Sequence, residues 1–399
     1  MKIRQITADE QPAISDPLQV YGFEPSPPSA SRLETLHAGQ RYHRENVTLV
    51  AEDDGVTVAE ATAIPMRQNV RGSVFSMAGI AGVASDPRVR RQGHVRRVLL
   101  ELLGRMRDEG CAVSALYPFK PSFYQRFGFV GTPQVRTVTF SPAGLSELLR
   151  TELAGEIRWE AATDGYAAYR DFTRRLLGQR HGFAVLPDSR TVRMRDANER
   201  WIVTARVAGE VVGALAYRIT DHGGDLIGDD LLATSALGRA LVLRFIAGHA
   251  DQVASVALRV SADETPELWA TDLAATITAT TAVPIESAPM ARVLSVTALN
   301  GMAVGAGSVA IEIVDDPFIA GRYVLDGRTG VLETSDHPAP TRPAAPTARL
   351  TAAGFSGLVY GVLSPEDVLV RGLGTVPPDA AAELAALFPR RSPDFFAHF

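Results

Sequence analysis

Hydrophobic and polar positions alternate from Val47 to Ile64 on both sides of a turn sequence, and this pattern predicts a β-hairpin. The apolar run from Ser73 to Ala84 predicts another strand. From Val95 the apolar residues recur every three or four positions, which predicts an amphipathic helix that ends near Gly110. A short apolar run from Cys111 to Tyr117 adds a strand. The predicted order is therefore hairpin, strand, helix, strand.

The same order of elements recurs downstream and predicts an internal duplication. Trp201–Thr220 reads as a hairpin, Leu226–Ala233 as a strand, Ser235–His249 as a helix and Val253–Val260 as a strand. The turn between strand and helix has several arginines in the first copy and only one in the second. We expect the second copy to keep the scaffold without the chemistry.

The last quarter of the chain differs from these two copies, because its pattern predicts short strands and turns. Tyr323–Glu333 predicts a hairpin, and the Pro/Ala-rich stretch His337–Pro346 predicts a mobile loop. A capping-box sequence at Ser364–Asp367 predicts one helix, and Asp379–Leu387 predicts another. The aromatic end of the chain is expected to pack against the protein.

Composition narrows the classes of protein. The chain has 399 residues, of which 46% are hydrophobic and 21% charged, and this indicates a folded protein of several domains. Its formal net charge of −5 gives no general attraction to nucleic acid or to anionic lipid. A single cysteine, Cys111, excludes an intrachain disulfide, and no metal site is expected. The absence of a signal peptide and of a long apolar run predicts a cytoplasmic protein without membrane association.

The turn that begins the first long helix is the strongest chemical signal. Arg90-x-x-Gly93 lies within a stretch of ten residues that contains five arginines. A helix N-terminus offers unpaired N–H groups, and glycine lets an anion approach the backbone. We interpret the turn as a phosphate site. The alternatives are a solvated basic helix start and a nucleic-acid stripe.

Two motifs resemble those of a known superfamily. Ala81–Val95 (AGVASDPRVRRQGHV) resembles motif A of the GCN5-related N-acetyltransferases, the GNAT superfamily, although Val95 stands where the family has a small residue. Ser122–Phe129 (SFYQRFGF) resembles the later aromatic-Gly-aromatic motif. The layout of the whole chain resembles the enhanced intracellular survival (Eis) family of aminoglycoside acetyltransferases.

This resemblance implies acetyl-coenzyme A as cosubstrate. Its pantetheine arm is expected on Val83, Ala84 and Ser85, where a strand ending at Pro87 leaves backbone groups free for an amide-bearing ligand. The resemblance places the pyrophosphate on six consecutive residues, Arg91, Gln92, Gly93, His94, Val95 and Arg96. It places a further cofactor contact on Phe119 and Lys120.

The resemblance also implies the catalytic residues. Tyr124 is expected to act as general acid, and its ordinary pKa of about 10 keeps the phenol protonated near neutral pH. The α-carboxylate of Phe399 is expected to assist deprotonation of the amine. The alternatives are a core aromatic at Tyr124 and a docked hydrophobic tail at Phe399. The spacing of acidic residues in the sequence does not show which carboxylates would line a pocket for a polycationic acceptor.

We therefore expect an α+β protein with tandem GNAT domains and a C-terminal domain similar to sterol carrier proteins. The expected ranges are 1–148 for the catalytic domain, 149–288 for the degenerate copy and 289–399 for the last domain. The expected reaction is direct acetyl transfer to primary amines of a polycationic small molecule such as an aminoglycoside, by a homo-oligomer that resemblance makes a hexamer. The alternatives are acetylation of protein lysines or polyamines, and a lipid or sterol carrier without catalysis.

Overall fold

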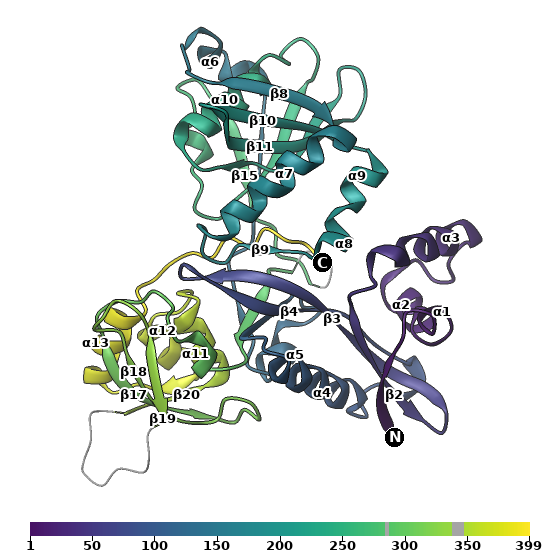
Figure 1. The fold of residues 1–399 in the computed structure, drawn as a ribbon, viewed down its shortest axis with the longest axis vertical. Coiled ribbons are helices and arrows are strands. Elements are labelled where there is room, and N and C mark those ends of the chain that lie inside the picture. The colour runs from purple at the N-terminus through teal and green to yellow at the C-terminus, as the bar shows by residue number, and fades with distance from the viewer. Residues whose placement is uncertain (284–286, 337–346) are drawn as a thin grey trace.

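The protein forms three α+β domains, each built on its own β-sheet (Figure 1). The computed structural model describes residues 1–283, 287–336 and 347–399. Within these ranges no helix combines the length and the apolar character that crossing a membrane requires. The predicted loop His337–Pro346 lies outside the described residues.

The first domain has an eight-stranded sheet in the order β1-β2-β3-β4-β5-β16-β6, with β9 beside β3. Its strands are β1 Lys2–Ile6, β2 Val47–Asp53, β3 Val56–Val70, β4 Ser73–Ser85, β5 Val113–Leu116, β6 Val130–Gly131, β9 Ala184–Val185 and β16 Met290–Val293. Its helices are α1 Gln11–Ile14, α2 Asp16–Phe23, α3 Ala30–Gly39, α4 His94–Asp108 and α5 Pro121–Gln125.

The second domain repeats this plan in a sheet of order β15-β7-β14-β12-β11-β10-β8, with β13 beside β11. Its strands are β7 Arg136–Phe140, β8 Glu156–Ala161, β10 Trp201–Val207, β11 Glu210–Ile219, β12 Asp225–Asp230, β13 Leu232–Ala233, β14 Ser255–Val260 and β15 Ala275–Thr278. Its helices are α6 Glu147–Arg150, α7 Ala162–Leu177, α8 Asp188–Thr191, α9 Arg193–Ala197 and α10 Ala236–Ala247.

The third domain has a five-stranded sheet of order β19-β18-β17-β20-β21 and three helices. The strands are β17 Ser308–Val314, β18 Gly321–Asp326, β19 Glu333–Asp336, β20 Thr347–Thr351 and β21 Gly374–Thr375. The helices are α11 Ala352–Val359, α12 Pro365–Val370 and α13 Pro378–Leu387. The predicted capping box is present at the start of α12.

Most predicted elements are confirmed, because their apolar residues face a core with the expected period. In α4 the buried positions include Val98, Leu99, Leu102 and Met106. The strand predicted over Leu226–Ala233 is wrong as a single element. It splits into β12 and β13, which pair with separate stretches of β11, and β12 pairs with β14 on its other side.

The three sheets do not follow the boundaries expected at 148 and 288. β7 precedes position 148 but lies in the second sheet, between β14 and β15. β16 follows position 288 but completes the first sheet, between β5 and β6. β9, within the range expected for the second domain, likewise pairs with β3 of the first sheet, so three strands lie in a sheet other than the one their sequence range predicts.

The last ten residues leave the third domain and run past the second domain to the first sheet, where the chain ends close to β3 and β4 (Figure 1). The backbone N–H of Asp394 donates to His181, and the ring of Phe396 stacks on Phe183 at 4.6 Å between centroids. Phe395 is 2% exposed. The aromatic tail therefore docks.

Candidate active site

The site begins where β4 and β5 separate. These strands pair in parallel only from Met77 to Ile80 of β4, because β5 ends at Leu116. From Ala81 to Ser85, β4 pairs with β3 alone. The residues predicted to hold the pantetheine arm, Val83, Ala84 and Ser85, lie on this stretch. Its outer backbone edge is open to an amide-bearing ligand, which can add to it as another strand would.

A β-bulge shapes this end of β4. The register with β3 shifts between Glu60 and Thr62, and Gly82 has a φ of +57°. The side-chain amide of Gln19 on α2 donates both to the carbonyl of Gly82 and to Oε1 of Glu60, each at 2.9 Å. A buried side-chain network thus holds the bulge.

Glu60 is fully buried, and its Oε2 has no hydrogen-bond partner among the described residues. Burial raises the pKa of this carboxyl to about 8, so it is protonated at neutral pH. A Glu on the side of β3 that faces α2, between the buried Ala59 and Ala61, is a signal that sequence reasoning missed. Its alternation with the alanines that face α4 could have revealed it.

The N-terminus of α4 presents free backbone amides. Gly93 is the N-cap with a φ of +85°, and no side chain caps this helix. The N–H groups of residues 93–96 make no hydrogen bond to any residue that the structure describes. A Cβ built on Gly93 would meet nothing within 4 Å. Open space in front of unpaired donors fits a phosphate group, so the residues present fit the expected pyrophosphate.

The arginines of this turn divide into two kinds. Arg88 is engaged by Asp86, which holds the pKa of that carboxyl at about 2, and the Arg90 guanidinium lies 5.6 Å from the centre of the Tyr21 ring. Arg91 and Arg96 form no ion pair with a described residue, so they remain available to an anion. The imidazole of His94 is buried and lies near Gln92 and Met1, so His94 can serve the cofactor through its backbone only.

Tyr124 lies on α5 within an aromatic cluster. Its ring packs edge to face against Phe119, Phe123 and Phe129 at 5.0–6.1 Å between centroids. Burial raises the pKa of the Tyr124 phenol, which therefore stays protonated. Phe119 is 42% exposed, and the exposed Lys120 is the N-cap of α5. Both lie beyond the end of β5.

The tail closes the site from the second domain's side. The Tyr117 hydroxyl donates to the carbonyl of Ala397 at 3.0 Å, and the His398 ring stacks on Tyr117. A Cβ built on Gly79 of β4 would lie 3.1 Å from the Phe399 ring, so this ring packs against the β4 backbone. Burial and the charge of Arg259 lower the pKa of His398 to about 4, which makes it a weak base.

A cavity of about 190 Å³ lies on the face of the sheet opposite α4. Gly82 of β4, Thr62 of β3 and Gln19 of α2 line it together with Asp16 and Glu24. A second cavity of about 370 Å³ lies between α7, α9 and the tail. Arg190 of α8 lines both.

The second domain lacks the corresponding site for two reasons. The N-terminus of α10 is already capped, because the Ser235 side chain accepts a hydrogen bond from Gly238. The strands equivalent to β4 and β5 remain paired beyond their bulge, where Asp230 lies opposite Arg259 and forms an ion pair with it at 2.7 Å. The only cysteine, Cys111, is buried, and burial raises the pKa of its thiol to about 11, which argues against a covalent acetyl-cysteine.

Comparison with known families identifies the class. Residues 2–131 match the family model of the acetyltransferase (GNAT) domain. Residues 2–131, which form most of the first domain, are therefore an acetyltransferase domain of the GNAT superfamily. No curated protein sequence matches the chain significantly.

Solved structures then match the chain as a whole. A GCN5-related N-acetyltransferase from Kribbella flavida has 22% identity and a TM-score of 0.79, with 100% of this chain and 98% of that chain covered. Eis1 from Mycobacterium abscessus has 18% identity and a TM-score of 0.76, with both chains covered to 100%. A conserved protein from Enterococcus faecalis has 18% identity and a TM-score of 0.81, with 100% and 99% covered. The three-domain fold is thus the fold of Eis1.

Proposed function

We propose that the protein transfers the acetyl group of acetyl-coenzyme A directly to the primary amine of a small molecule. The row of four free amides at residues 93–96 carries this proposal, because a helix start without an internal cap or an acidic first turn is suited to a diphosphate. The open edge of β4 at Val83–Ser85 supports it, since it offers backbone partners to the amides of the pantetheine arm.

Acetyl-coenzyme A supplies the thioester, and Tyr124 supplies a proton for the departing sulfur. The phenol proton is held at Oη, because the surrounding rings of Phe119, Phe123 and Phe129 disfavour a phenolate. No described residue accepts a hydrogen bond from this hydroxyl, so it is free to donate toward the cleft. Such a general acid contributes about 10²–10⁴-fold to rate.

The α-carboxylate of Phe399 is proposed to attract the ammonium group of the acceptor and to assist removal of its proton. The packing of the Phe399 ring against Gly79 supports this role, since it brings the end of the tail to β4. The contact between Tyr117 and Ala397 holds the tail two residues before Phe399.

Because the chain resembles the Eis family, aminoglycosides are the first acceptors to test. For the same reason a homohexamer is the first oligomeric state to test. The acceptor is proposed to enter the cavity beside Gly82.

The experiment has two parts. Coenzyme A at 100 times its dissociation constant is expected to stabilise the full chain by about 2.7 kcal/mol, measured by thermal denaturation, whereas a panel of fatty acids and sterols is not. Acetylation of aminoglycosides, polyamines and a lysine peptide is then followed by mass. Stabilisation by lipids without any effect of coenzyme A would refute the enzyme and favour a carrier.

A chain extended by one glycine after Phe399 tests the tail. We expect a loss of turnover with unchanged affinity for coenzyme A, because the extension moves the carboxylate away from β4. A chain in which Phe399 is replaced by Leu keeps the carboxylate in place and serves as the control. Full activity of the extended chain would leave the tail with a packing role only.

A further inference from the structure

Arg190 is a half-buried cation without a carboxylate partner. Its Nη1 is buried and has no hydrogen-bond partner among the described residues, and its Nη2 reaches only Nε2 of His43, at 3.5 Å. Burial and the neighbouring Arg193 lower the pKa of Arg190. A guanidinium that loses water without gaining an anion is costly, and such a cost is typical of a site completed by a ligand.

Nearby acids do not neutralise Arg190, because other arginines occupy them. Asp188, on the same helix, pairs with Arg174. Asp196 pairs with Arg195 at 2.8 Å. Arg193 likewise forms no ion pair with a carboxylate of the described chain.

The charges of Arg190 and Arg193 also affect the neighbouring His43. Its pKa is lowered to about 4 by burial and by the charges of Arg190 and Arg193. The imidazole is therefore neutral at pH 7 and cannot serve as the missing counter-ion. It lines the same cavity as Arg190.

The acidic residues in and near this cavity offer less free negative charge to a ligand than their number suggests. Glu24 is held by a two-pronged contact with Arg32 at 2.6 and 2.7 Å, and Glu60 behind the cavity is protonated at neutral pH. Asp16 is the lining carboxyl without an arginine partner, and it accepts from Gln40 at 2.8 Å. The cavity thus offers a carboxyl to a cationic amine, that of Asp16, which also lies 3.4 Å from Nε2 of His37, and it offers the Arg190 guanidinium to an anion.

We propose that Arg190 binds an anionic group of the acceptor, so that the preferred acceptors carry a primary amine together with a carboxylate or a phosphate. This inference rests on the proposed acetyl transfer and names its acceptor class. A polycation would place a like charge beside Arg190, and within this cavity it would gain the carboxylate of Asp16 in return. Gly82, which lines the same cavity, belongs to the strand that is proposed to hold the cosubstrate.

The test compares acceptors that differ in one group. The acceptors 4-aminobutyrate, 6-aminohexanoate and O-phosphoethanolamine are assayed against pentylamine and kanamycin by release of coenzyme A. We expect kcat/KM for the best anionic amine to exceed that for pentylamine by about tenfold to a hundredfold, the range of a charge-assisted contact. Comparison of the carboxylate and phosphate acceptors distinguishes the two sources of the anion.

Variants connect this preference to the guanidinium. Arg190→Gln is expected to abolish the preference, mainly through KM, and Arg190→Lys to restore part of it. Arg195→Gln is the matched control, since Arg195 is exposed, paired with Asp196 and lines neither cavity. Coenzyme A binding should be unchanged in all three. Equal preference in Arg190→Gln and the unaltered protein would overturn the inference, as would a preference of the unaltered protein for kanamycin or pentylamine.

A binding measurement separates this inference from the proposed function. Stabilisation of the full chain by inorganic phosphate and by 4-aminobutyrate is measured by thermal denaturation, with and without Arg190→Gln. Loss of stabilisation in the variant supports an anion site even if no amine is acetylated. Coenzyme A binding without any effect of Arg190→Gln on either probe refutes the anion site and leaves the acetyltransferase intact.

Discussion

Burial keeps four ionisable residues around the first domain's cleft uncharged at neutral pH. It raises the pKa of Tyr124 and of Glu60, which therefore hold their protons, and it contributes to the lowered pKa of His43 and His398, which therefore lack theirs. Burial also lowers the pKa of Arg190, but its guanidinium stays charged, and it is the group proposed to bind an anionic part of the acceptor.

Tyr124→Phe tests the proposed acid. We expect kcat to fall by about 10²–10⁴-fold, because the phenol proton is lost, whereas the affinity for coenzyme A stays the same since the ring remains in its cluster. Steady-state kinetics and a coenzyme A titration measure the two quantities. Tyr217→Phe, which removes a buried hydroxyl of the second domain that contacts Trp159, should leave kcat unchanged. An unchanged rate in Tyr124→Phe would remove Tyr124 from the mechanism.

Glu60 predicts a pH dependence of stability. Its pKa is near 4.5 in the unfolded chain and about 8 in the folded protein, so the folded state binds the extra proton between these values. Stability contributed by the protonated carboxyl is therefore complete at low pH and is lost as the pH rises toward 8.

Denaturant unfolding of the unaltered protein and of Glu60→Gln at pH 5 and pH 8 measures this effect. Relative to the variant, the unaltered protein should lose at most about 1.4 kcal/mol per pH unit over the interval. The glutamine keeps an acceptor for Gln19 and does not ionise. Parallel pH profiles of the two proteins would show that Glu60 is not buried as described.

Two equivalent elements of the duplicated plan explain why only one domain holds a site. In the first domain the helix start α4 leaves its amides free, and β4 leaves β5 after four paired residues. In the second domain Ser235 caps α10, and the Asp230–Arg259 pair closes the strands. The difference therefore lies in a cap and in an ion pair, and both sheets keep the same plan.

Gly93→Ala tests the free helix start. The residue has a positive φ, so alanine should cost about 1–2 kcal/mol of stability, and it adds a Cβ at the residue whose backbone N–H is the first of the free amides. We expect the affinity for coenzyme A to fall by roughly tenfold or more, measured by titration. Gly209→Ala is the matched control, because Gly209 has a φ of +84° and equally open surroundings in the second domain. An equal affinity in both variants would contradict the phosphate site.

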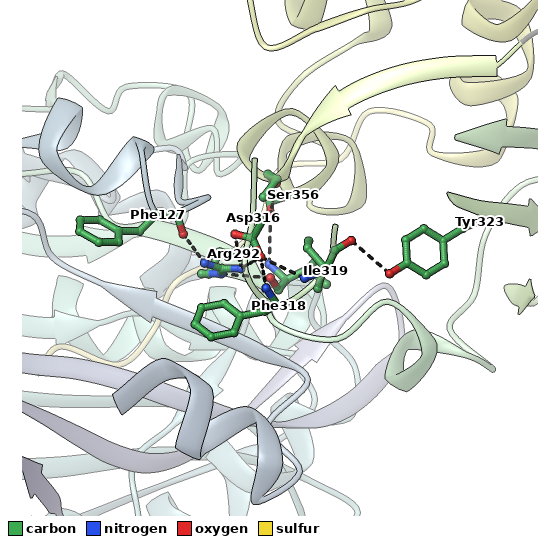
Figure 2. A network of polar contacts seen from close by, with 9 residues as sticks. Phe127, Arg292, Asp316, Phe318, Ile319, Tyr323 and Ser356 are labelled. Carbon is green, nitrogen blue, oxygen red and sulfur yellow. Dashed lines mark hydrogen bonds and ion pairs between the residues drawn. The ribbon is translucent and has the colours of Figure 1, made fainter. Parts of the chain in front are cut away.

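On the scale of the whole molecule, Arg292 of β16 joins the first and third domains. Its guanidinium is fully buried, donates to the carbonyl of Phe127 and pairs with Asp316 at 3.0 Å (Figure 2). The neighbouring N–H of Val293 donates to Ser356 of α11. Asp316 also accepts from the backbone of Ile319, so one carboxylate holds both the arginine and the loop after β17.

Asp316→Asn is expected to destabilise the protein by about 3–5 kcal/mol, because it leaves the Arg292 guanidinium buried without a counter-ion. Denaturant unfolding measures the change. Asp108→Asn breaks an exposed pair with Arg107 and should change stability by less than about 1 kcal/mol. A loss in Asp316→Asn as small as that of the control would mean that the buried pair does not hold the domains together.

The local pattern of the sequence determined the elements and the prediction of a phosphate site. Periodicity predicts α4, the two hairpins and the duplication, because a strand or helix shows its core face in the spacing of its own residues. The glycine and the arginines before α4 predict an anion site, because they are close neighbours in the sequence and their combination can be recognised without the fold.

The tertiary structure alone decided what depends on distant partners. β7 and β16 exchange domains, because strand pairing is set by free sheet edges and not by distance along the chain. The sequence analysis singled out neither Glu60 nor Arg190. Glu60 packs against α2 and Arg190 packs beside His43, and this packing removes both side chains from water. Oε2 of Glu60 and Nη1 of Arg190 then have no hydrogen-bond partner among the described residues, which only the tertiary structure shows.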